Sequence, residues 1–479
     1  MKEGYIKKKD RKKILLLTDD IRVHSGVAQI GREIIMNTSH KYNWVQLAGA
    51  INHPDKGKIQ DLSDDVNKEL GIKDAYCKLY PVDGYGDQQT LKEVMHREQV
   101  DALFLITDPR YFTWVFQMEH EIRRKIPIAY LNIWDNYPAP MYNKEFYESC
   151  DALFGISKQT VNINKLVLGD LAEDKIIKYI PHGLNNNNFT PLEKENVKLM
   201  NFSRAVTGED EDDKFDFKLL FNSRNIRRKN IPDLLMAWRL FTDRLTPEEA
   251  KKCLLILHTE MVLDAGTDLS AVIELLCPQE TCKVRLSQSK LSTEDMNLLY
   301  NMVDGVVLLS NAEGWGLALT EGLLTEKPII ATVTGGMQDQ MRFEDEDGKW
   351  VEFSKEFPSN HKGRYKKHGK WAFPVYPTSR TIVGSPQTPY IYDDQHNHED
   401  AADQIHKLWS MSKEERIECG KAGREWALGD EAGFTSEKMA KRVGEGMDEL
   451  FNTWKPRKKF VIIKDTDYKQ RVLSHNIKY

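Results

Sequence analysis

The stretch VDGVVLLSNAEGWGLALTEGLLTEKPIIATVTGG, residues 303–336, decides the fold. Its apolar run 306–309 predicts a buried strand, a glycine-punctuated turn leads into a helix from about Leu317, and 328–333 predicts a second buried strand. A strand, a helix and a strand in this order form a βαβ unit of a parallel sheet. Ligands bind such sheets beyond the carboxyl ends of the strands, so the turn before Leu317 is a candidate binding site.

Two carboxylates lie inside this unit, Glu313 in the turn and Glu321 eight residues later. Eight residues are about two turns of helix, which places both side chains on nearly the same face. The start of the helix favours a phosphate, and Gly314 and Gly316 let a phosphate approach the backbone. The pattern favours a nucleotide sugar whose sugar and ribose hydroxyls bind the two carboxylates. The alternative is that Glu313 only complements the helix dipole and Glu321 is solvated.

Cationic residues follow another predicted strand, 217–221, in the segment NSRNIRRKN. Arginine can bind a diphosphate through two hydrogen bonds, and lysine supplies a point charge. A basic run is usually a solvated surface, but its place after a buried strand favours a phosphate site at this end of the sheet.

The segment EGWGLALTEG, followed by KPIIAT and Gly335-Gly336, resembles the Glu-x7-Glu signature of retaining family 4 glycosyltransferases. The resemblance covers roughly residues 14–449 with gaps. It implies the α/β GT-B fold, with two Rossmann-like, doubly wound domains facing a central cleft. It also implies transfer of a sugar from a nucleoside diphosphate donor to a hydroxyl acceptor, with retention of configuration, without a metal and without a cofactor.

The resemblance implies roles for individual residues. Arg224 and Lys229 match the family's spacing of the two cations that neutralise the donor diphosphate, and Glu313 would lie near the transferred sugar. These three are the candidate catalytic residues, and Arg227 and Arg228 are extra cations. The candidate donor-binding residues are Glu321, Gly314, Trp315, Gly316, Leu317 and Gly26. Gly26 lies in the loop after the predicted strand 14–17, where the family usually has two glycines and an ordinary βα turn is the alternative.

Candidate acceptor residues are Asp135, Trp134 and His182. The family commonly has His-Asp after the strand predicted at 128–133, where this chain has Trp134-Asp135. A turn aspartate is the alternative for Asp135, and core packing is favoured for the aromatic residues around Trp134. His182 belongs to a Pro-His-Gly motif after the predicted strand 176–180, and a structural histidine is the alternative there.

The chain alternates predicted strands and helices, as a doubly wound fold requires. We expect an N-terminal acceptor-side domain at 1–205, a C-terminal nucleotide-sugar domain at 206–439, and last helices, 440–479, that cross back onto the first domain. Residues 113–124 are expected to form one helix, and the polar segment 185–213 to form the linker and a flexible loop.

Residues 338–397 form an insertion relative to the family. Its segment HKGRYKKHGKWAFPVYP places basic residues among Tyr365, Trp371, Phe373 and Tyr376, which can grip nucleic acid and stack on bases. A small β subdomain and a protein interface are alternatives, and the acidic FEDEDG before it weakens the case for nucleic acid. One functional alternative is therefore a DNA-modifying glycosyltransferase acting on a hydroxymethylated base, and another is a non-catalytic nucleotide-sugar-binding protein.

The amino-acid composition is typical of a globular protein. Charged residues make up 29% of the 479 residues, and the formal net charge of −5 argues against a globally cationic nucleic-acid binder. The six cysteines are scattered and are expected to be reduced thiols. The acidic triplets at 210–212 and 465–467 follow no buried strand and are interpreted as surface acids rather than metal ligands. The apolar run ILLL near the N-terminus is too short for a signal or membrane span, so a cytoplasmic protein is expected.

Overall fold

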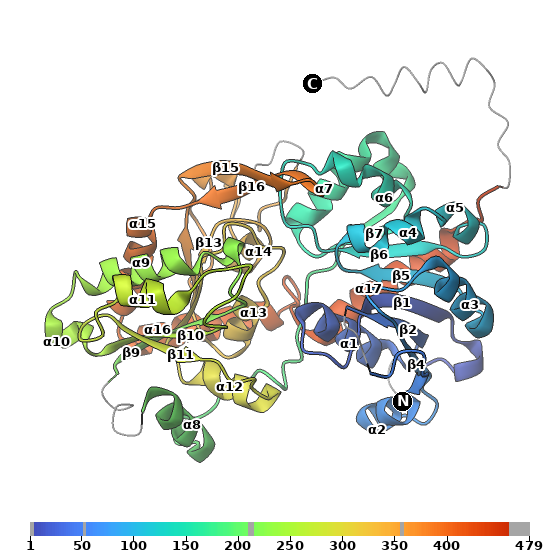
Figure 1. The fold of residues 1–479 in the computed structure, drawn as a ribbon. Helices are drawn as coiled ribbons and strands as arrows, with labels where there is room; N and C mark the ends of the chain where they lie inside the picture. The colour runs from blue at the N-terminus through green and yellow to red at the C-terminus, as the bar shows by residue number, and fades with distance from the viewer. Residues whose placement is uncertain (1–3, 51–53, 209–214, 355–358, 459–479) are drawn as a thin grey trace.

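The computed structural model describes residues 4–50, 54–208, 215–354 and 359–458. Two mainly parallel sheets, each with helices packed against it, form two domains that face each other (Figure 1). The predicted α/β architecture with two Rossmann-like units is confirmed. The acidic triplets at 210–212 and 465–467 lie outside the described residues.

The first domain is built around an eight-stranded sheet with the order β3-β4-β2-β1-β5-β6-β7-β8. Its strands are β1 (Lys13–Asp19), β2 (Asn43–Gly49), β3 (Gln60–Asp61), β4 (Cys77–Pro81), β5 (Ala102–Ile106), β6 (Ile128–Asn132), β7 (Ala152–Gly155) and β8 (Ile176–Tyr179). Its helices are α1 (Gly26–Thr38), α2 (Ser63–Leu70), α3 (Gln88–Glu98), α4 (Thr113–Phe116), α5 (Glu119–Ile122), α6 (Lys144–Glu148) and α7 (Lys158–Leu168). The strands pair in parallel, except β3 with β4. The apolar runs of β1, β2, β5, β6 and β7 are buried on both faces, which is typical of a parallel sheet.

The second domain is built around a six-stranded sheet with the order β11-β10-β9-β12-β13-β14. Its strands are β9 (Phe217–Asn222), β10 (Cys253–His258), β11 (Lys283–Ser287), β12 (Gly305–Leu308), β13 (Ile329–Thr332) and β14 (Ala372–Val375). Its helices are α8 (Val197–Thr207), α9 (Ile231–Thr242), α10 (Pro247–Ala250), α11 (Leu269–Leu276), α12 (Thr293–Asn301), α13 (Leu317–Leu324), α14 (Met337–Met341), α15 (His398–Trp409) and α16 (Lys413–Leu428). The predicted βαβ unit is confirmed as β12, α13 and β13.

The last described helix, α17 (Ser436–Thr453), returns to the first domain, where it lies against α1 (Figure 1). Tyr42 donates a hydrogen bond of 2.6 Å from its hydroxyl to the carboxylate of Asp448 on this helix. Gly446 lies so close to Phe154 that an added Cβ would come within 2.7 Å of the ring. The C-terminal end of the described chain is thereby packed on the first sheet.

Two local predictions are wrong. Residues 113–124 form the short helices α4 and α5 because the backbone at Met118 (φ −111°, ψ 13°) leaves the helical region, and the run Trp-Val-Phe before it forms helix weakly. The segment predicted to be irregular contains α8, whose N-cap Asn196 accepts a hydrogen bond from the amide of Leu199. This helix packs against α12 and β11 of the second domain.

No helix in the described ranges combines the length and the apolar character that crossing a bilayer requires.

Candidate active site between the two domains

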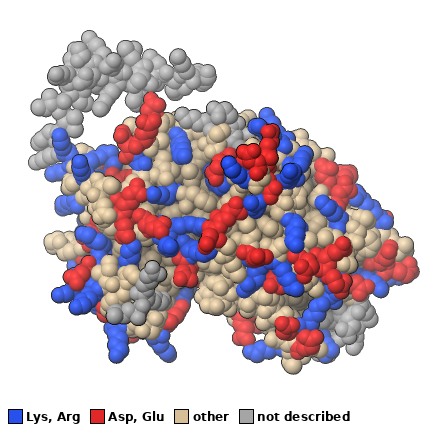
Figure 2. Space-filling view, turned by 180° about the vertical axis from the view of Figure 1, so that it is seen from behind, with Lys and Arg blue, Asp and Glu red and all other residues tan. Residues whose placement is uncertain are grey.

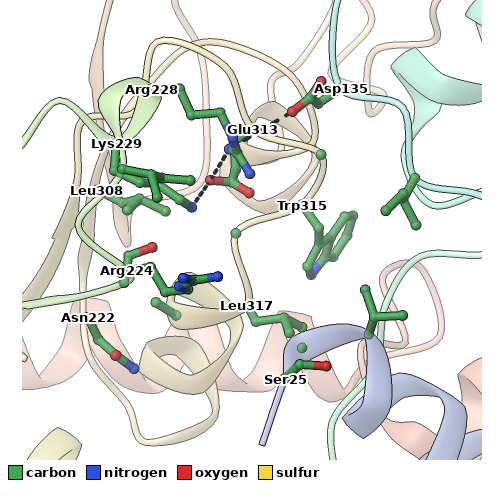
Figure 3. Close-up of a pocket in the computed structure, with 18 of the residues that line it drawn as sticks. Ser25, Asp135, Asn222, Arg224, Arg228, Lys229, Leu308, Glu313, Trp315 and Leu317 are labelled. Atoms are coloured by element: carbon green, nitrogen blue, oxygen red, sulfur yellow. Dashed lines mark hydrogen bonds and ion pairs between the residues drawn. The ribbon is translucent and has the colours of Figure 1, made fainter. Parts of the chain in front are cut away.

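A cleft of about 1280 Å³ lies between the domains, at the carboxyl ends of strands from both sheets. The first domain lines it with the loop after β1 and the segments after β6 and β8. The second domain lines it with the segments after β9, β10, β11 and β12, as Figure 3 shows for part of the cleft. Every predicted site residue lines this cleft.

An ion cluster of the buried Lys229 and Glu313 and the partly buried Arg228 lies in the cleft (Figure 3). The ammonium group of Lys229 donates a hydrogen bond to Oε2 of Glu313, and Nη1 of Arg228 lies 3.1 Å from the same oxygen. Burial alone would raise the pKa of Glu313, but the two cations outweigh it and bring that pKa to about 2. Burial lowers the pKa of Lys229, and the charge of Glu313 opposes that shift. Glu313 is therefore an ionised carboxylate at neutral pH.

Arg224 lies apart from this cluster. Its side chain is 72% exposed, and its nearest acidic partner is Glu260, at 3.7 Å. Residues 227–229 form a 3-10 turn after β9, which directs Arg228 and Lys229 to Glu313. Both predicted cations, Arg224 and Lys229, thus line the cleft, while Arg228, regarded as an extra cation, joins Lys229 at the predicted catalytic carboxylate.

Asp135 faces the cluster from the first domain. Its carboxylate lies 3.9 Å from Nη1 of Arg228. Burial raises the pKa of Asp135, and the charge of Arg228 acts in the opposite direction. Trp134 is 7% exposed, and its Nε1 donates to the carbonyl of Asn136 at 2.9 Å. Its side chain is therefore mostly buried in the core, and the small exposed part lines the cleft.

Glu321 lies on α13, on the wall of the cleft beside β9. The hydroxyl of Tyr300 donates to its Oε2, and Nδ2 of Asn222 donates to the same atom at 3.3 Å. Burial raises the pKa of Glu321 to about 7, and these hydrogen bonds limit the rise. The predicted solvated alternative is wrong, because Glu321 is only 8% exposed.

The glycine-rich turn before α13 brings the two domains into contact. Gly316 adopts φ +85° as the N-cap of α13, a conformation that favours glycine. A Cβ at Gly314 would come within 2.9 Å of the carbonyl of Ile133, and one at Gly26 within 3.1 Å of the side chain of Leu317. The glycines therefore let the second-domain turn approach the first domain closely.

His182 is buried beside Trp315, with the two rings edge to face at 6.2 Å. Burial lowers the pKa of His182 to about 3, so the imidazole is neutral at physiological pH. It can hydrogen-bond a ligand but cannot supply a charge.

The aromatic residues of the insertion belong mainly to the interior. Trp371 and Phe373 are 6% and 3% exposed, and β14, which carries Phe373, extends the second sheet. Tyr376 donates to the carbonyl of Tyr365 at 3.0 Å. Trp371 and Phe373 therefore cannot stack on exposed bases. In Figure 2, acidic and basic side chains are interspersed over the face shown.

Comparisons with known proteins agree with the two-domain fold. Residues 201–356 match the family model described as Glycosyl transferases group 1. Similar solved structures include HepE from Anabaena in complex with UDP and glucose, at 14% identity and a TM-score of 0.62, covering 92% of this chain and 100% of that one. Sucrose-phosphate synthase from Thermosynechococcus elongatus has 14% identity, a TM-score of 0.63 and the same two coverages. A glycosyltransferase from Rickettsia africae has 16% identity and a TM-score of 0.60, covering 93% and 100%.

No curated protein matches the sequence. The structural likeness and the family model together account for the fold and for the central βαβ unit, which lies inside the matched residues. The chain therefore has the GT-B fold and carries, in residues 201–356, a group 1 glycosyltransferase domain, which makes it an enzyme of the glycosyltransferase class.

Proposed function

We propose that the protein transfers a sugar from a UDP-sugar to a hydroxyl acceptor, with retention of configuration and without a metal, as the family 4 resemblance implies. The observation that carries the proposal is the contact of the buried Lys229 and the partly buried Arg228 with Glu313, in the turn before α13. The charge that develops during transfer lies on the diphosphate, and cations fixed in a buried site stabilise such charge strongly. Anabaena HepE has been solved with UDP and with UDP-glucose, which supports uracil as the donor base.

In the proposed complex the donor diphosphate lies between the cations and the first amides of α13. The diphosphate competes with Glu313 for Lys229, and the freed carboxylate accepts hydrogen bonds from hydroxyls of the transferred sugar. Arg224 lies at the open side of the cleft, where it can join these cations.

The acceptor approaches from the first domain. Asp135 lies on that side and can accept the hydrogen bond of the attacking hydroxyl. As the hydroxyl oxygen bonds to the anomeric carbon, the bond from that carbon to the diphosphate oxygen breaks and its electron pair leaves with the diphosphate. The proton of the hydroxyl passes to the carboxylate of Asp135. The neutral His182 and the exposed edge of Trp134 line the same region.

The direct test is release of nucleoside diphosphate from UDP-, GDP- and ADP-sugars, with and without simple sugars as acceptors. We expect UDP release that an acceptor accelerates, and a product with the donor's anomeric configuration. Activity that persists in a chelator would support the metal-free reaction. Binding of UDP-sugars without any turnover would instead support a non-catalytic binding protein.

If Glu321 binds the ribose hydroxyls, the KM for the donor should depend on pH. Its pKa of about 7 means that it is protonated below this pH and accepts hydrogen bonds as a carboxylate above it. We therefore expect the donor KM to rise by up to about tenfold per pH unit as the pH falls below about 7. Glu321→Gln should bind the donor about 10- to 100-fold more weakly and flatten this profile.

The matched control for this profile is Glu274→Gln, which removes an exposed acid on α11 away from the cleft. We expect it to keep the wild-type profile. If the donor KM of Glu321→Gln still rises at low pH, the pH dependence belongs to another group.

A further inference from the structure

The insertion contains an antiparallel hairpin, β15 (Ser379–Ser385) and β16 (Thr388–Gln395), that reaches from the second domain to the first (Figure 1). Its base is fixed to the second domain. Asp393 pairs with Arg227, the amide of Asp394 donates to the carbonyl of Asn311 at 2.9 Å, and Thr334 donates to the carboxylate of Asp394 at 2.7 Å.

The rest of the hairpin is hydrogen-bonded to the first domain. The amide of Tyr392 donates to the carbonyl of Tyr137, and Nδ2 of Asn136 donates to the carbonyl of Tyr392, both at 2.7 Å. The hydroxyl of Tyr142 donates to the carbonyl of Tyr390 at 3.0 Å. The hairpin is thus held at both ends, across the first-domain side of the cleft.

One face of the hairpin lines the cleft. Val383 and Ile391 are directly opposite each other in the hairpin register, and both line the cleft, as do Gly384, Ser385 and Thr388. The hairpin therefore forms a wall on the acceptor side of Asp135, built from apolar and small uncharged side chains.

The described part of the first domain offers this side of the cleft no free cation. Among the described first-domain residues that line the cleft, Arg110 is the single Arg or Lys. Its Nε lies 2.8 Å from Oδ1 of Asp108, and its Nη1 donates to the hydroxyl of Thr388 in the hairpin. Asp108 thereby balances the charge of the guanidinium, and Thr388 of the hairpin fixes its position. The group is therefore poorly placed to bind a phosphate.

We propose that this hairpin selects the acceptor, and that the acceptor is a compact, uncharged polyhydroxyl molecule such as a neutral mono- or disaccharide. This rests on the proposed glycosyl transfer. A long chain or a nucleic-acid duplex cannot bring a hydroxyl to Asp135 past a wall bound to both domains, and a phosphorylated sugar meets no free first-domain cation.

The experiment compares acceptors with one donor that the enzyme is shown to hydrolyse. The acceptors are a neutral disaccharide, its phosphate ester, an oligosaccharide of about six sugars and a hydroxymethylated DNA duplex. We expect kcat/KM for the disaccharide to exceed that for each of the others by about tenfold or more.

Two variants test the wall. In the first variant, residues 382–392 are replaced by Asn-Gly, a pair suited to a two-residue hairpin turn. The shortened hairpin keeps Asp394 and the paired residues Thr381 and Asp393. In the second, Ile391→Ala opens the wall without removing its backbone contacts. We expect both to raise the oligosaccharide-to-disaccharide ratio of kcat/KM, the first by about tenfold and the second by about threefold, with acceptor-free donor hydrolysis kept.

The control Ile382→Ala changes the neighbouring side chain, which is 70% exposed and does not line the cleft, and should leave the ratio unchanged. Donor hydrolysis with equal use of all acceptors, a preference for the phosphate ester, or an unchanged ratio in both variants would overturn the hairpin proposal alone. Absence of donor binding and hydrolysis in the wild type would overturn the proposed function itself.

Discussion

Lys229→Ala is expected to lower kcat by about 100- to 1000-fold, because it removes the buried cation that the proposed reaction uses to stabilise the departing diphosphate. Lys229 is only 8% exposed, so its ammonium group acts in a poorly hydrated site where its charge is weakly screened. Its loss also leaves Arg228 as the one basic partner of Glu313 within the described residues, so the pKa of Glu313 should rise from about 2. Steady-state kinetics with saturating donor measure the effect on kcat.

The control for this variant is Lys252→Ala, which removes a half-exposed lysine paired with Asp216 before β9, at the opposite end of that sheet. We expect it to keep wild-type kcat. The kcat of Arg224→Ala should lie between those of the two lysine variants, because the exposed side chain of Arg224 reaches the donor only from the open side of the cleft. If Lys229→Ala lowered the melting temperature but left kcat per folded molecule unchanged, Lys229 would be a structural partner of Glu313 and the proposed leaving-group role would fail.

Much of the second domain could be predicted from sequence because its signals are local. The short apolar run 306–309, followed by a glycine-rich turn and a second apolar run, indicates buried parallel strands, and a carboxylate in such a turn lies at the carboxyl edge of the sheet. Glu313 and Lys229, each predicted separately at this edge of its sheet, lie in the same cleft, and their direct contact is a finding of the structure. The helix start at Leu317 is likewise fixed locally, since Gly316 supplies the positive φ at its N-cap.

The remaining features depend on contacts between distant segments. Whether Arg224 or Arg228 reaches Glu313 depends on the 3-10 turn at 227–229, whose geometry is not encoded in the spacing of cations. The strands β15 and β16 carry Thr, Val, Tyr and Ile, which favour strands, but their position over the cleft follows from hydrogen bonds to Asn136 and Tyr137 about 250 residues away. A small β subdomain is one of the alternatives for the insertion, and the pair of β-prone runs around Ser385-Pro386-Gln387 is the signal that could have located this hairpin.

Gly335→Ala is expected to unfold the site locally and to abolish measurable transfer. Gly335 has φ +53°, and a Cβ there would lie 1.8 Å from the carbonyl oxygen of Glu313, which is a backbone atom with no freedom to rotate away. The amide of the next residue, Gly336, donates to this same carbonyl at 3.0 Å. The loop after β13 thus holds the Glu313 turn by backbone contact, and an added methyl group must separate the two. We expect a loss of about 3 kcal/mol or more in the free energy of unfolding, measured by denaturant titration.

Gly348→Ala separates the two causes of that loss. Gly348 also has a positive φ, +76°, but an added Cβ there meets nothing within 4 Å, so the substitution carries the conformational penalty of about 1–2 kcal/mol without a clash. It should therefore lower stability modestly and leave kcat unchanged. If Gly335→Ala behaved like Gly348→Ala in both stability and kcat, the Glu313 turn would not depend on its contact with the loop after β13. If it lost stability but kept kcat, the position of Glu313 would be set instead by its ion pairs with Lys229 and Arg228.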